Sequence, residues 1–269
     1  MPIAKSNPNS AGTNWARMRI CLLMFFTFNF SLLIFNCGLD IEDPTPPSPP
    51  IWVQKSLPEE WPERGIDAHE SGGIFLEWLS NPDEENITSY YIYRAEYFEL
   101  NDSIGDYELL INVSDSSIPQ HQFVDRTVSL RVKYFFKLMA ENFSQNFSAF
   151  SDSLAYTLLP TINAGTMIPN GFLEILGADR ILTWNGNYYF DTEEYCVTIL
   201  DNEDFIVFRT MLSPRNYLAG DETWIIPHEI TLLSATVYKW RIDMGGQYIE
   251  DLESAGSESP WATFLYSGF

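Results

Sequence analysis

The sequence predicts an all-β fold class, arranged as tandem β-sandwiches, on the basis of three observations. Runs with the two-residue alternation of strands recur along the chain, and they are rich in aromatic and β-branched residues. Turn clusters such as SNPDEEN, SDSS and NGN separate these runs at regular spacing. The periodicity of amphipathic helices is nearly absent. The strand-like runs are GIFLEWL, SYYIYRA, YELLINV, HQFVDRTV, VKYFFKLMA, ILTW, YCVTIL, FIVFRTML and VYKWRID.

Residues 1–37 are typical of an export signal and not of a folded domain. Lys5, Arg17 and Arg19 are the only charged residues in this segment, and the apolar run ICLLMFFTFNFSLLIF follows at residues 20–35. A basic region followed by an apolar one is the order that an export signal requires. The apolar run is shorter than the roughly 20 residues that a spanning helix needs, so an uncleaved membrane anchor is the alternative and not the first reading.

Cys37 ends this segment. The run resembles a bacterial lipoprotein signal, in which an aliphatic residue stands three places before the cysteine that receives the lipid, here Ile34 and Cys37. Asn36 departs from the small residue that is usual before that cysteine, which leaves the cleavage open. A start at Met18 instead of Met1 would give a signal of ordinary lipoprotein length. The resemblance implies a lipid anchor in the cell envelope, at the outer membrane or the cell surface, with the leaflet undetermined.

Residues 38–50 form the predicted linker. Asp40, Glu42 and Asp43 are followed by five prolines between Pro44 and Pro50. Such a composition cannot bury a core and favours extended polyproline conformations. We therefore expect a semi-rigid acidic spacer between the anchor and the folded part.

Residues 51–160 form the first predicted sandwich. The alternation groups three sets of side chains, each on one face of a strand: Ile74, Leu76 and Trp78; Tyr91 and Tyr93; and Tyr134, Phe136, Leu138 and Ala140. Such sets are what a strand packed on one face presents to its core.

This region resembles a fibronectin type III domain, a family with an immunoglobulin-like fold. Trp78 matches the tryptophan of the family's second strand, Asn81 and Pro82 match the turn after it, and YIYR at residues 91–94 matches the next strand. FVD at residues 123–125 matches the turn into the sixth strand. AENFSQNFSAFSDS matches the last loop and strand, so the resemblance covers about 110 residues of the chain.

Two tyrosines are candidates for the tyrosine corner, in which a tyrosine hydroxyl bonds back to the backbone a few residues upstream. Leu130 and Tyr134 stand about where the family has its corner, with the leucine one residue closer than usual. Leu233 precedes Tyr238 by five residues, which is the usual spacing.

Residues 161–269 repeat the plan as a second fibronectin type III-like domain. Trp184 ends an alternating strand in ILTWNG, and EYCVTILDNED follows as the next strand and its turn. SPWATFLY, with Trp261 and Phe264, is similar to the closing strand of such domains. The boundary between the two predicted sandwiches falls within LLPTINAG, residues 158–165.

Cysteine usage and charge restrict the class of protein. With Cys21 in the signal and Cys37 carrying the lipid, only Cys196 remains in the exported part, so we expect no disulfide framework and a small buried thiol. After Cys37 there are 37 acidic and 12 basic residues. A surface of this sign repels phosphate backbones, which excludes nucleic acid as a partner.

The sequence contains none of the motifs that would indicate an enzyme or a cofactor. His69, His121 and His228 are scattered without a zinc-ligand spacing, and no nucleophile elbow or Gly-rich phosphate loop occurs. The acidic stretches at residues 82–86 and 201–204 lack the glycine and distal glutamate of a calcium loop. We therefore expect no catalytic residues, no metal and no cofactor.

Two aromatic loops are the candidate contact surfaces. Phe143 and Phe147 lie in the loop that fibronectin type III modules often use for binding, and Tyr188, Tyr189 and Phe190 lie in the second-to-third strand loop of the second domain. Exposed aromatic rings stack on sugars or anchor protein interfaces. The alternative is that these rings pack on the rim of their own sandwich.

The function that follows is a non-enzymatic cell-envelope lipoprotein that presents its sandwiches for protein or glycan interaction. A carbohydrate-binding accessory protein is an alternative, and it requires exposed coplanar aromatic rings. Sequons at Asn86, Asn101, Asn112, Asn142 and Asn146 leave a secreted eukaryotic protein open by composition, although the lipoprotein-like signal argues against it.

Overall fold

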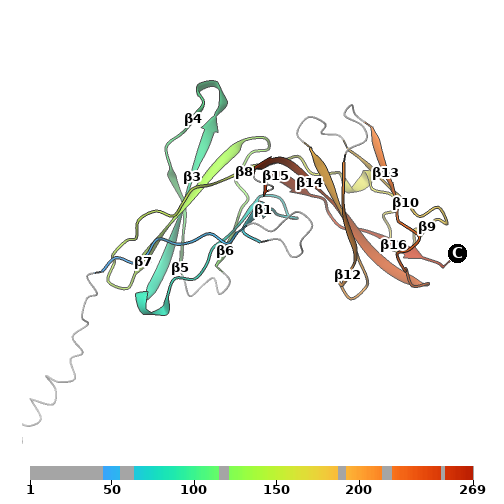
Figure 1. Cartoon of the computed structure of the whole chain (residues 1–269), viewed down its shortest axis with the longest axis horizontal. Helices are drawn as coiled ribbons and strands as arrows, with labels where there is room; N and C mark the ends of the chain where they lie inside the picture. Colours follow the sequence, from blue (N-terminus) through green and yellow to red (C-terminus); the bar gives the residue numbers. More distant parts are fainter. Residues whose placement is uncertain are drawn as a thin grey trace, which may run out of the picture. The chain divides into compact units, whose positions relative to one another are not determined.

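The computed structural model describes residues 45–54, 64–114, 121–186, 192–213, 220–249 and 252–268. The predicted signal with Cys37, the first part of the predicted linker, and the predicted contact residues Tyr188, Tyr189 and Phe190 lie outside the described residues. The regular secondary structure of the described part is β-strand, apart from short 3-10 helices (Figure 1). It contains no helix of the length and hydropathy that crossing a bilayer requires.

The first sandwich contains eight strands. They are β1 (Ile66–Ala68), β2 (Ile74–Glu77), β3 (Ile87–Phe98), β4 (Ser103–Ile104), β5 (Glu108–Ser114), β6 (Gln122–Asp125), β7 (Lys133–Asn142) and β8 (Leu154–Leu158). One sheet has the order β1-β2-β6, and the other has β3 at its centre, with β7 and then β8 on one side and β4 and β5 on the other. Two antiparallel sheets of this kind form an immunoglobulin-like sandwich.

The second sandwich repeats this arrangement. Its strands are β9 (Ile175–Leu176), β10 (Ile181–Asn185), β11 (Glu194–Leu200), β12 (Ile206–Leu212), β13 (Asp221–Ile225), β14 (Thr236–Ile249), β15 (Leu252–Glu258) and β16 (Ala262–Tyr266). One sheet pairs β10 with β13, and an isolated bridge from Ile168 to Thr183 adds a third segment. The other sheet runs β12-β11-β14, and β14 is long enough to pair with both β15 and β16.

Short 3-10 helices close three of the turns. They are η1 (Asp83–Glu85), η2 (Glu99–Asn101) and η4 (Ala164–Thr166). Asn86 and Asp102 end η1 and η2 in the left-handed region, which Asn and Asp tolerate better than most residues. Gly73, between β1 and β2, has φ +107°, and a Cβ there would lie 2.5 Å from the Asp125 carbonyl oxygen, so this turn requires glycine.

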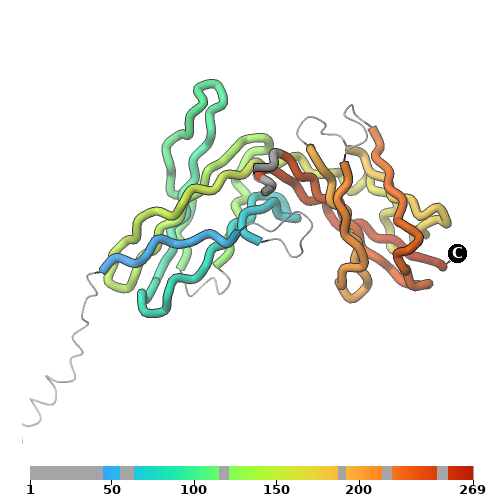
Figure 2. Tube along the Cα trace, viewed as in Figure 1, coloured from blue at the N-terminus to red at the C-terminus, as the bar shows by residue number. Residues whose placement is uncertain are grey.

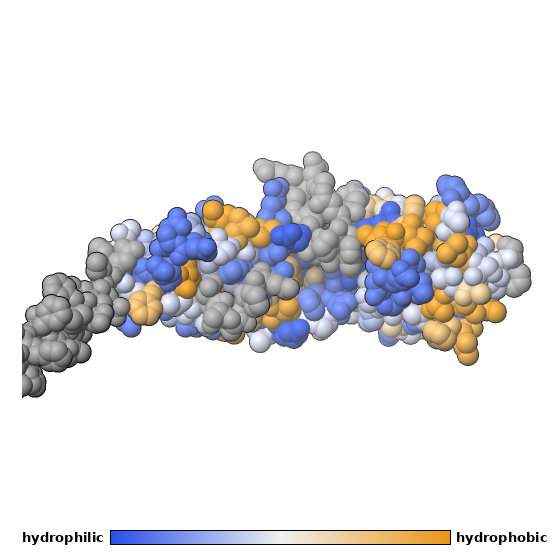
Figure 3. Space-filling view, turned by 90° about the horizontal axis from the view of Figure 1, so that it is seen from below, coloured by the Kyte–Doolittle hydropathy of each residue, from blue (hydrophilic) through white to orange (hydrophobic). Residues whose placement is uncertain are grey.

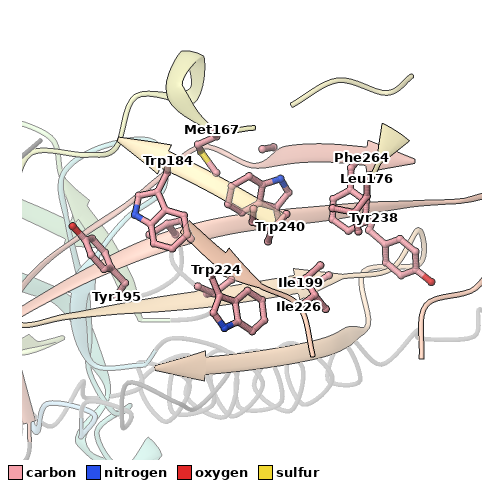
Figure 4. Close-up of a cluster of buried hydrophobic side chains, with 14 of the residues drawn as sticks. Met167, Leu176, Trp184, Tyr195, Ile199, Trp224, Ile226, Tyr238, Trp240 and Phe264 are labelled. Carbon is pink, nitrogen blue, oxygen red and sulfur yellow. The ribbon is translucent and has the colours of Figure 1, made fainter. Parts of the chain in front are cut away.

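Each sandwich has its own hydrophobic core. The first core extends from Trp52 to Leu158 and contains every member of two predicted sets, namely Ile74, Leu76 and Trp78, and Tyr134, Phe136, Leu138 and Ala140. The second core extends from Ile162 to Phe264, and Trp184 and Trp240 meet edge to face at its centre (Figure 4). The last residue of the first core is Leu158, and the first residue of the second core is Ile162. The fold class of two tandem all-β sandwiches is therefore confirmed.

Both sandwiches have a tyrosine corner with the same geometry. The Tyr238 hydroxyl accepts a hydrogen bond from the Leu233 N–H at 2.6 Å, as predicted. In the first sandwich, the Tyr134 hydroxyl accepts from Ser129, at 3.1 Å, and not from Leu130, which is exposed. The residue three places before each tyrosine, Arg131 or Ala235, has a positive φ. The spacing is therefore five residues in both corners, and Leu130 is not the counterpart of Leu233.

The end of the predicted linker is part of the fold. In residues 45–50 only Pro47 and Pro50 are buried, which is the three-residue period of a polyproline helix that packs one face against a surface. Ser48 donates from its N–H and its Oγ to the Glu85 carboxylate, and the Asn142 side chain donates to the Thr45 carbonyl. The prediction that residues 38–50 are a free spacer is thus wrong for residues 45–50, which we call the proline strap.

A strand pairing connects the two sandwiches. The hairpin of β14 and β15 places Ala255 and Gly256 beside Thr157 and Leu158 of β8, in parallel register. The sheet of the first sandwich that contains β3 and the sheet of the second that contains β14 are thereby joined into one hydrogen-bonded sheet. The tube in Figure 2 shows the end of β8 meeting the dark red β15, nearly 100 residues later in the sequence.

Candidate functional site

The loop between β7 and β8 carries the two predicted contact residues that the structure describes. Phe143 is 69% exposed and Phe147 is 45% exposed. A tight turn presents them, because the Gln145 N–H bonds to the Asn142 carbonyl and Gln145 has a positive φ. Neither side chain belongs to a hydrophobic core. The surface placement predicted for these two residues is therefore observed, whereas their binding role stays a prediction.

Phe147 belongs to a larger set of aromatic side chains on the outer side of the sheet that contains β3 and β7. We call this set the aromatic face. It consists of Tyr91, Tyr93, Tyr97, Tyr107, Phe135, Phe147 and Phe150. The rings meet in pairs: Phe147 lies 5.5 Å from Tyr91, and Phe150 lies 5.0 Å from Tyr93, between ring centroids.

Strand alternation positions this face. Tyr90 and Ile92 of β3 point into the first core, so Tyr91 and Tyr93 point outward. Phe136 and Leu138 of β7 are likewise in the core, which leaves Phe135 on the outer side. The alternation pattern placed Tyr91 and Tyr93 on one face of their strand, and this is the outer face, because Tyr90 and Ile92 occupy the core instead.

Two lysines lie among these rings. The Lys137 ammonium is 4.4 Å from the Tyr107 ring centroid and 5.9 Å from that of Phe150. Lys133 Nζ is 5.7 Å from the ring of Tyr97 and 5.6 Å from that of Phe135. Such cation–π contacts are typically worth about 0.5–1 kcal/mol at exposed sites. Acidic residues outnumber basic ones by 37 to 15 in the whole chain, so two adjacent cations make this face distinct from most of the surface.

Hydrogen bonds fix the polar edges of the face. The Tyr91 hydroxyl donates to Glu141 Oε2 at 2.7 Å, and the Tyr107 hydroxyl lies 2.7 Å from Ser153 Oγ. The bond to the Glu141 carboxylate raises the pKa of Tyr91, because the phenol must stay protonated to donate. The Tyr97 hydroxyl donates to Asp102. Three of the seven rings are therefore held in place by hydrogen bonds of their hydroxyl groups.

The geometry distinguishes between two uses of these rings. The planes of Phe147 and Tyr91 meet at 69°, and those of Phe150 and Tyr93 at 89°, so neighbouring rings are not coplanar. A flat platform for stacking successive sugar rings requires coplanar faces. Partly exposed aromatic side chains that meet at an angle are instead typical of the anchors of protein interfaces. Hydrophobic residues form patches over both sandwiches on the side seen in Figure 3, with hydrophilic residues between them.

On the second sandwich, side chains at the centre of the corresponding outer side are buried. Cys196 and Thr198 of β11 and Arg241 of β14 point away from the second core, yet all three are buried. Burial, with the nearby Asp243 carboxylate, raises the pKa of the Cys196 thiol to about 11. The predicted buried thiol is observed, and it is protonated at neutral pH.

Among the described residues, no three His, Cys, Asp or Glu side chains converge as a metal site would require. In the acidic turn after β11, Asp201 accepts bonds from the Glu203 and Phe205 N–H groups, and Asp204 pairs with Lys239. The acidic residues 83–85 form η1, where Glu85 binds the proline strap.

Comparison with known proteins gives only distant likenesses. No protein-family model matches the chain, and no curated protein matches it by sequence. The FN1-FN3 domains of chicken CNTN1 superpose with a TM-score of 0.36 at 12% identity, covering 82% of this chain and 69% of that chain. A β-1,2-glucanase from Parabacteroides distasonis has a TM-score of 0.30 at 18% identity, covering 45% of this chain and 15% of that chain. The assignment to tandem β-sandwiches therefore rests on the strand order and the two cores described above.

Proposed function

We propose that this protein is a non-enzymatic lipoprotein of the cell envelope that docks a protein partner through the aromatic face of its first sandwich. The observation that carries the proposal is the aromatic face itself, seven rings with two lysines on the open side of a sheet. Interface energy concentrates in a few aromatic anchors of this kind. The partner surface that fits is apolar with acidic groups, because it must contact the rings and pair with Lys133 and Lys137.

The anchor in this proposal is a lipid on Cys37. The support is the apolar run that ends at this cysteine and the aliphatic Ile34 three places before it. Labelled fatty acid should enter the protein in cells, and Cys37→Ala should abolish the label, whereas Cys21→Ala should not. Labelling that survives Cys37→Ala would contradict the anchor without bearing on the docking role.

Site-specific photocrosslinking tests the docking role. A photoreactive phenylalanine analogue placed at position 147 or 150 should yield a discrete protein adduct in cells of the source organism. The control is position 172, because Phe172 is at 69% more exposed than Phe147 and Phe150, at 45% each, but lies on the second sandwich. Adducts at 147 and 150 that are absent at 172 would support the proposal. The same adducts at all three positions, or none at 147 and 150, would contradict it.

A further inference from the structure

The two sandwiches share a joint that is held by backbone and side-chain bonds. The Leu159 N–H donates to the Gly256 carbonyl at 2.8 Å, directly after the β8–β15 pairing. Ser257 Oγ donates to the Pro160 carbonyl at 3.0 Å, and Thr161 Oγ1 donates to the Glu258 carbonyl. The connecting segment is therefore bonded to β15 along its length. These bonds therefore fix the walls of a cleft at this joint.

A buried arginine stands at the centre of the joint. The Arg241 side chain is 2% exposed, and its guanidinium pairs with Glu258 and Asp243, each at 2.9 Å. It also lies 4.0 Å from the Glu70 carboxylate of the first sandwich and 4.9 Å from the centroid of the Trp261 ring. Trp261 Nε1 donates to the same Glu70 carboxylate at 3.1 Å. Side chains from both sandwiches thus fix one another.

A cavity of about 570 Å³ opens beside this cluster. Its wall from the first sandwich includes His69, Phe75 and Gln122, and its wall from the second includes Lys239, Arg241 and Trp261. The volume falls within the roughly 300–1,000 Å³ of small-ligand sites, which often lie at domain interfaces.

The wall of this cavity carries charged groups of both signs. Glu70, Asp204 and Glu258 provide carboxylates, and Lys239 and Arg241 provide cations. Lys239 Nζ lies 2.5 Å from Asp204 Oδ1, and Arg241 pairs with Glu258, so donors and acceptors stand next to each other. Such pairs can accept from and donate to a ligand's hydroxyls at the same time, with bonds stronger than those between neutral groups.

We propose that this interdomain cavity binds a neutral saccharide. Hydroxyl groups are at once donors and acceptors, which suits the paired ions, and the apolar faces of a sugar ring suit the partly exposed Trp261 and Phe75. An anionic ligand would meet three carboxylates within a strongly acidic protein. A cationic ligand would meet Lys239 and the buried guanidinium. The proposal is independent of the docking role of the aromatic face, since the two sites share no residue.

Calorimetric titration of the full-length protein in detergent tests the proposal. The probes are glucose, galactose, mannose and N-acetylglucosamine with their disaccharides, and glucuronate and glucosamine serve as charged comparators. At least one neutral sugar should bind more tightly than either comparator. Trp261→Ala should weaken that binding on the order of tenfold or more. Phe172→Ala is the control, because it removes an exposed ring outside the cavity and should leave the binding unchanged.

Lys239→Gln keeps the test valid if Trp261→Ala disturbs the joint. The Lys239 side chain is 40% exposed and outside the buried cluster, so this variant should fold normally and still weaken binding by several-fold. Thermal unfolding of each variant separates lost binding from lost structure. The absence of binding by every neutral sugar, binding that survives both substitutions in folded protein, or tighter binding of a charged comparator would each overturn the proposal.

Discussion

The two sandwiches have the same strand order but use the outer sides of their equivalent sheets differently. In the first sandwich, the outward residues Tyr93 and Phe135 at the centre of the sheet are partly exposed and belong to the aromatic face. In the second, the equivalent strands β11 and β14 turn Thr198 and Arg241 outward, and both are buried. One outer side is open for contact, and the other supports the joint. A common fold therefore does not give the two domains a common role.

The largest expected effect comes from removing the buried cation of the second sandwich. Arg241→Ala leaves Glu258 and Asp243 buried without their partner, and we expect a loss of about 3–5 kcal/mol in the free energy of unfolding, measured by urea denaturation. Arg241→Met is the comparison variant, because it keeps most of the side-chain volume and removes the charge. A loss below about 1 kcal/mol for the alanine variant would mean that the ion pairs do not support the joint.

The tyrosine corners should behave alike, because they are the feature in which the sandwiches agree most closely. Tyr134→Phe and Tyr238→Phe each delete one hydroxyl and leave a buried ring in place. Each should cost about 1–2 kcal/mol, mainly in the unfolding of its own sandwich. Hydrogen exchange of the strands on either side would locate the loss. If Tyr238→Phe changes neither sandwich, the corner contributes nothing to the second domain.

The proline strap packs on the first sandwich, and we expect acidic pH to weaken its attachment there. Burial alone would raise the pKa of Glu85, but hydrogen bonds from Asn81 and Ser48 outweigh burial and hold the pKa below its ordinary value of 4.5. The stabilisation is thus present above pH 4.5 and is lost as the pH falls through the lowered pKa. Glu85→Gln should cost less than about 1 kcal/mol at neutral pH, because the site is partly exposed.

Denaturation at neutral pH and at about pH 3 measures this difference. The matched control is Glu84→Gln, because Glu84 is an exposed neighbour in η1. The effect of Glu85→Gln should shrink at the acidic pH, where the wild-type carboxylate is also protonated. An effect of the same size at both pH values would show that ionisation of Glu85 does not hold the strap.

The smallest expected effect is at the loop that carries Phe143. Phe143→Ala should change the free energy of unfolding by less than about 0.5 kcal/mol, as surface substitutions do. Phe147→Ala should cost about 1 kcal/mol, because it also removes the contact with Tyr91. Phe136→Ala on the adjacent strand, in the core, provides the scale at about 3–5 kcal/mol. A loss of that size in the free energy of unfolding of Phe143→Ala would show that Phe143 packs inside the sandwich. Phe143 would then not belong to the contact surface.

Local patterns in the sequence were sufficient for the fold class and for one corner. Two-residue alternation placed Trp78 in the first core, and Trp184 lies in the second core as its strand pattern suggested, because burial on one face imposes that period. The five-residue spacing gave the Tyr238 corner. The partner in the first corner, Ser129, stands at the same spacing, and it was missed because the match to the family's leucine indicated Leu130 instead.

The joint and the strap depend on contacts that local patterns do not contain. Arg241 alternates with core residues, which predicts an exposed cation, but in the fold Glu258 of β15 and the Trp261 ring lie against its guanidinium and the side chain is buried. The prolines read as a spacer, although their three-residue spacing is also what a docked polyproline helix requires. The aromatic face was missed for the same reason: its rings come from β3, the segment between β4 and β5, β7 and the loop after β7, which lie far apart in the sequence and meet only in the folded sheet.

The most direct test of the contrast between the two outer sides is hydroxyl-radical footprinting of the full-length protein. Free cysteine reacts with such radicals faster than tyrosine or phenylalanine, so protection of Cys196 is informative. The account predicts that Tyr93, Phe147 and Phe150 are oxidised while Cys196, at 4% exposure, is not. Denatured protein, in which Cys196 should react first, is the control. Oxidation of Cys196 as fast as that of Tyr93 in the folded protein would contradict the account.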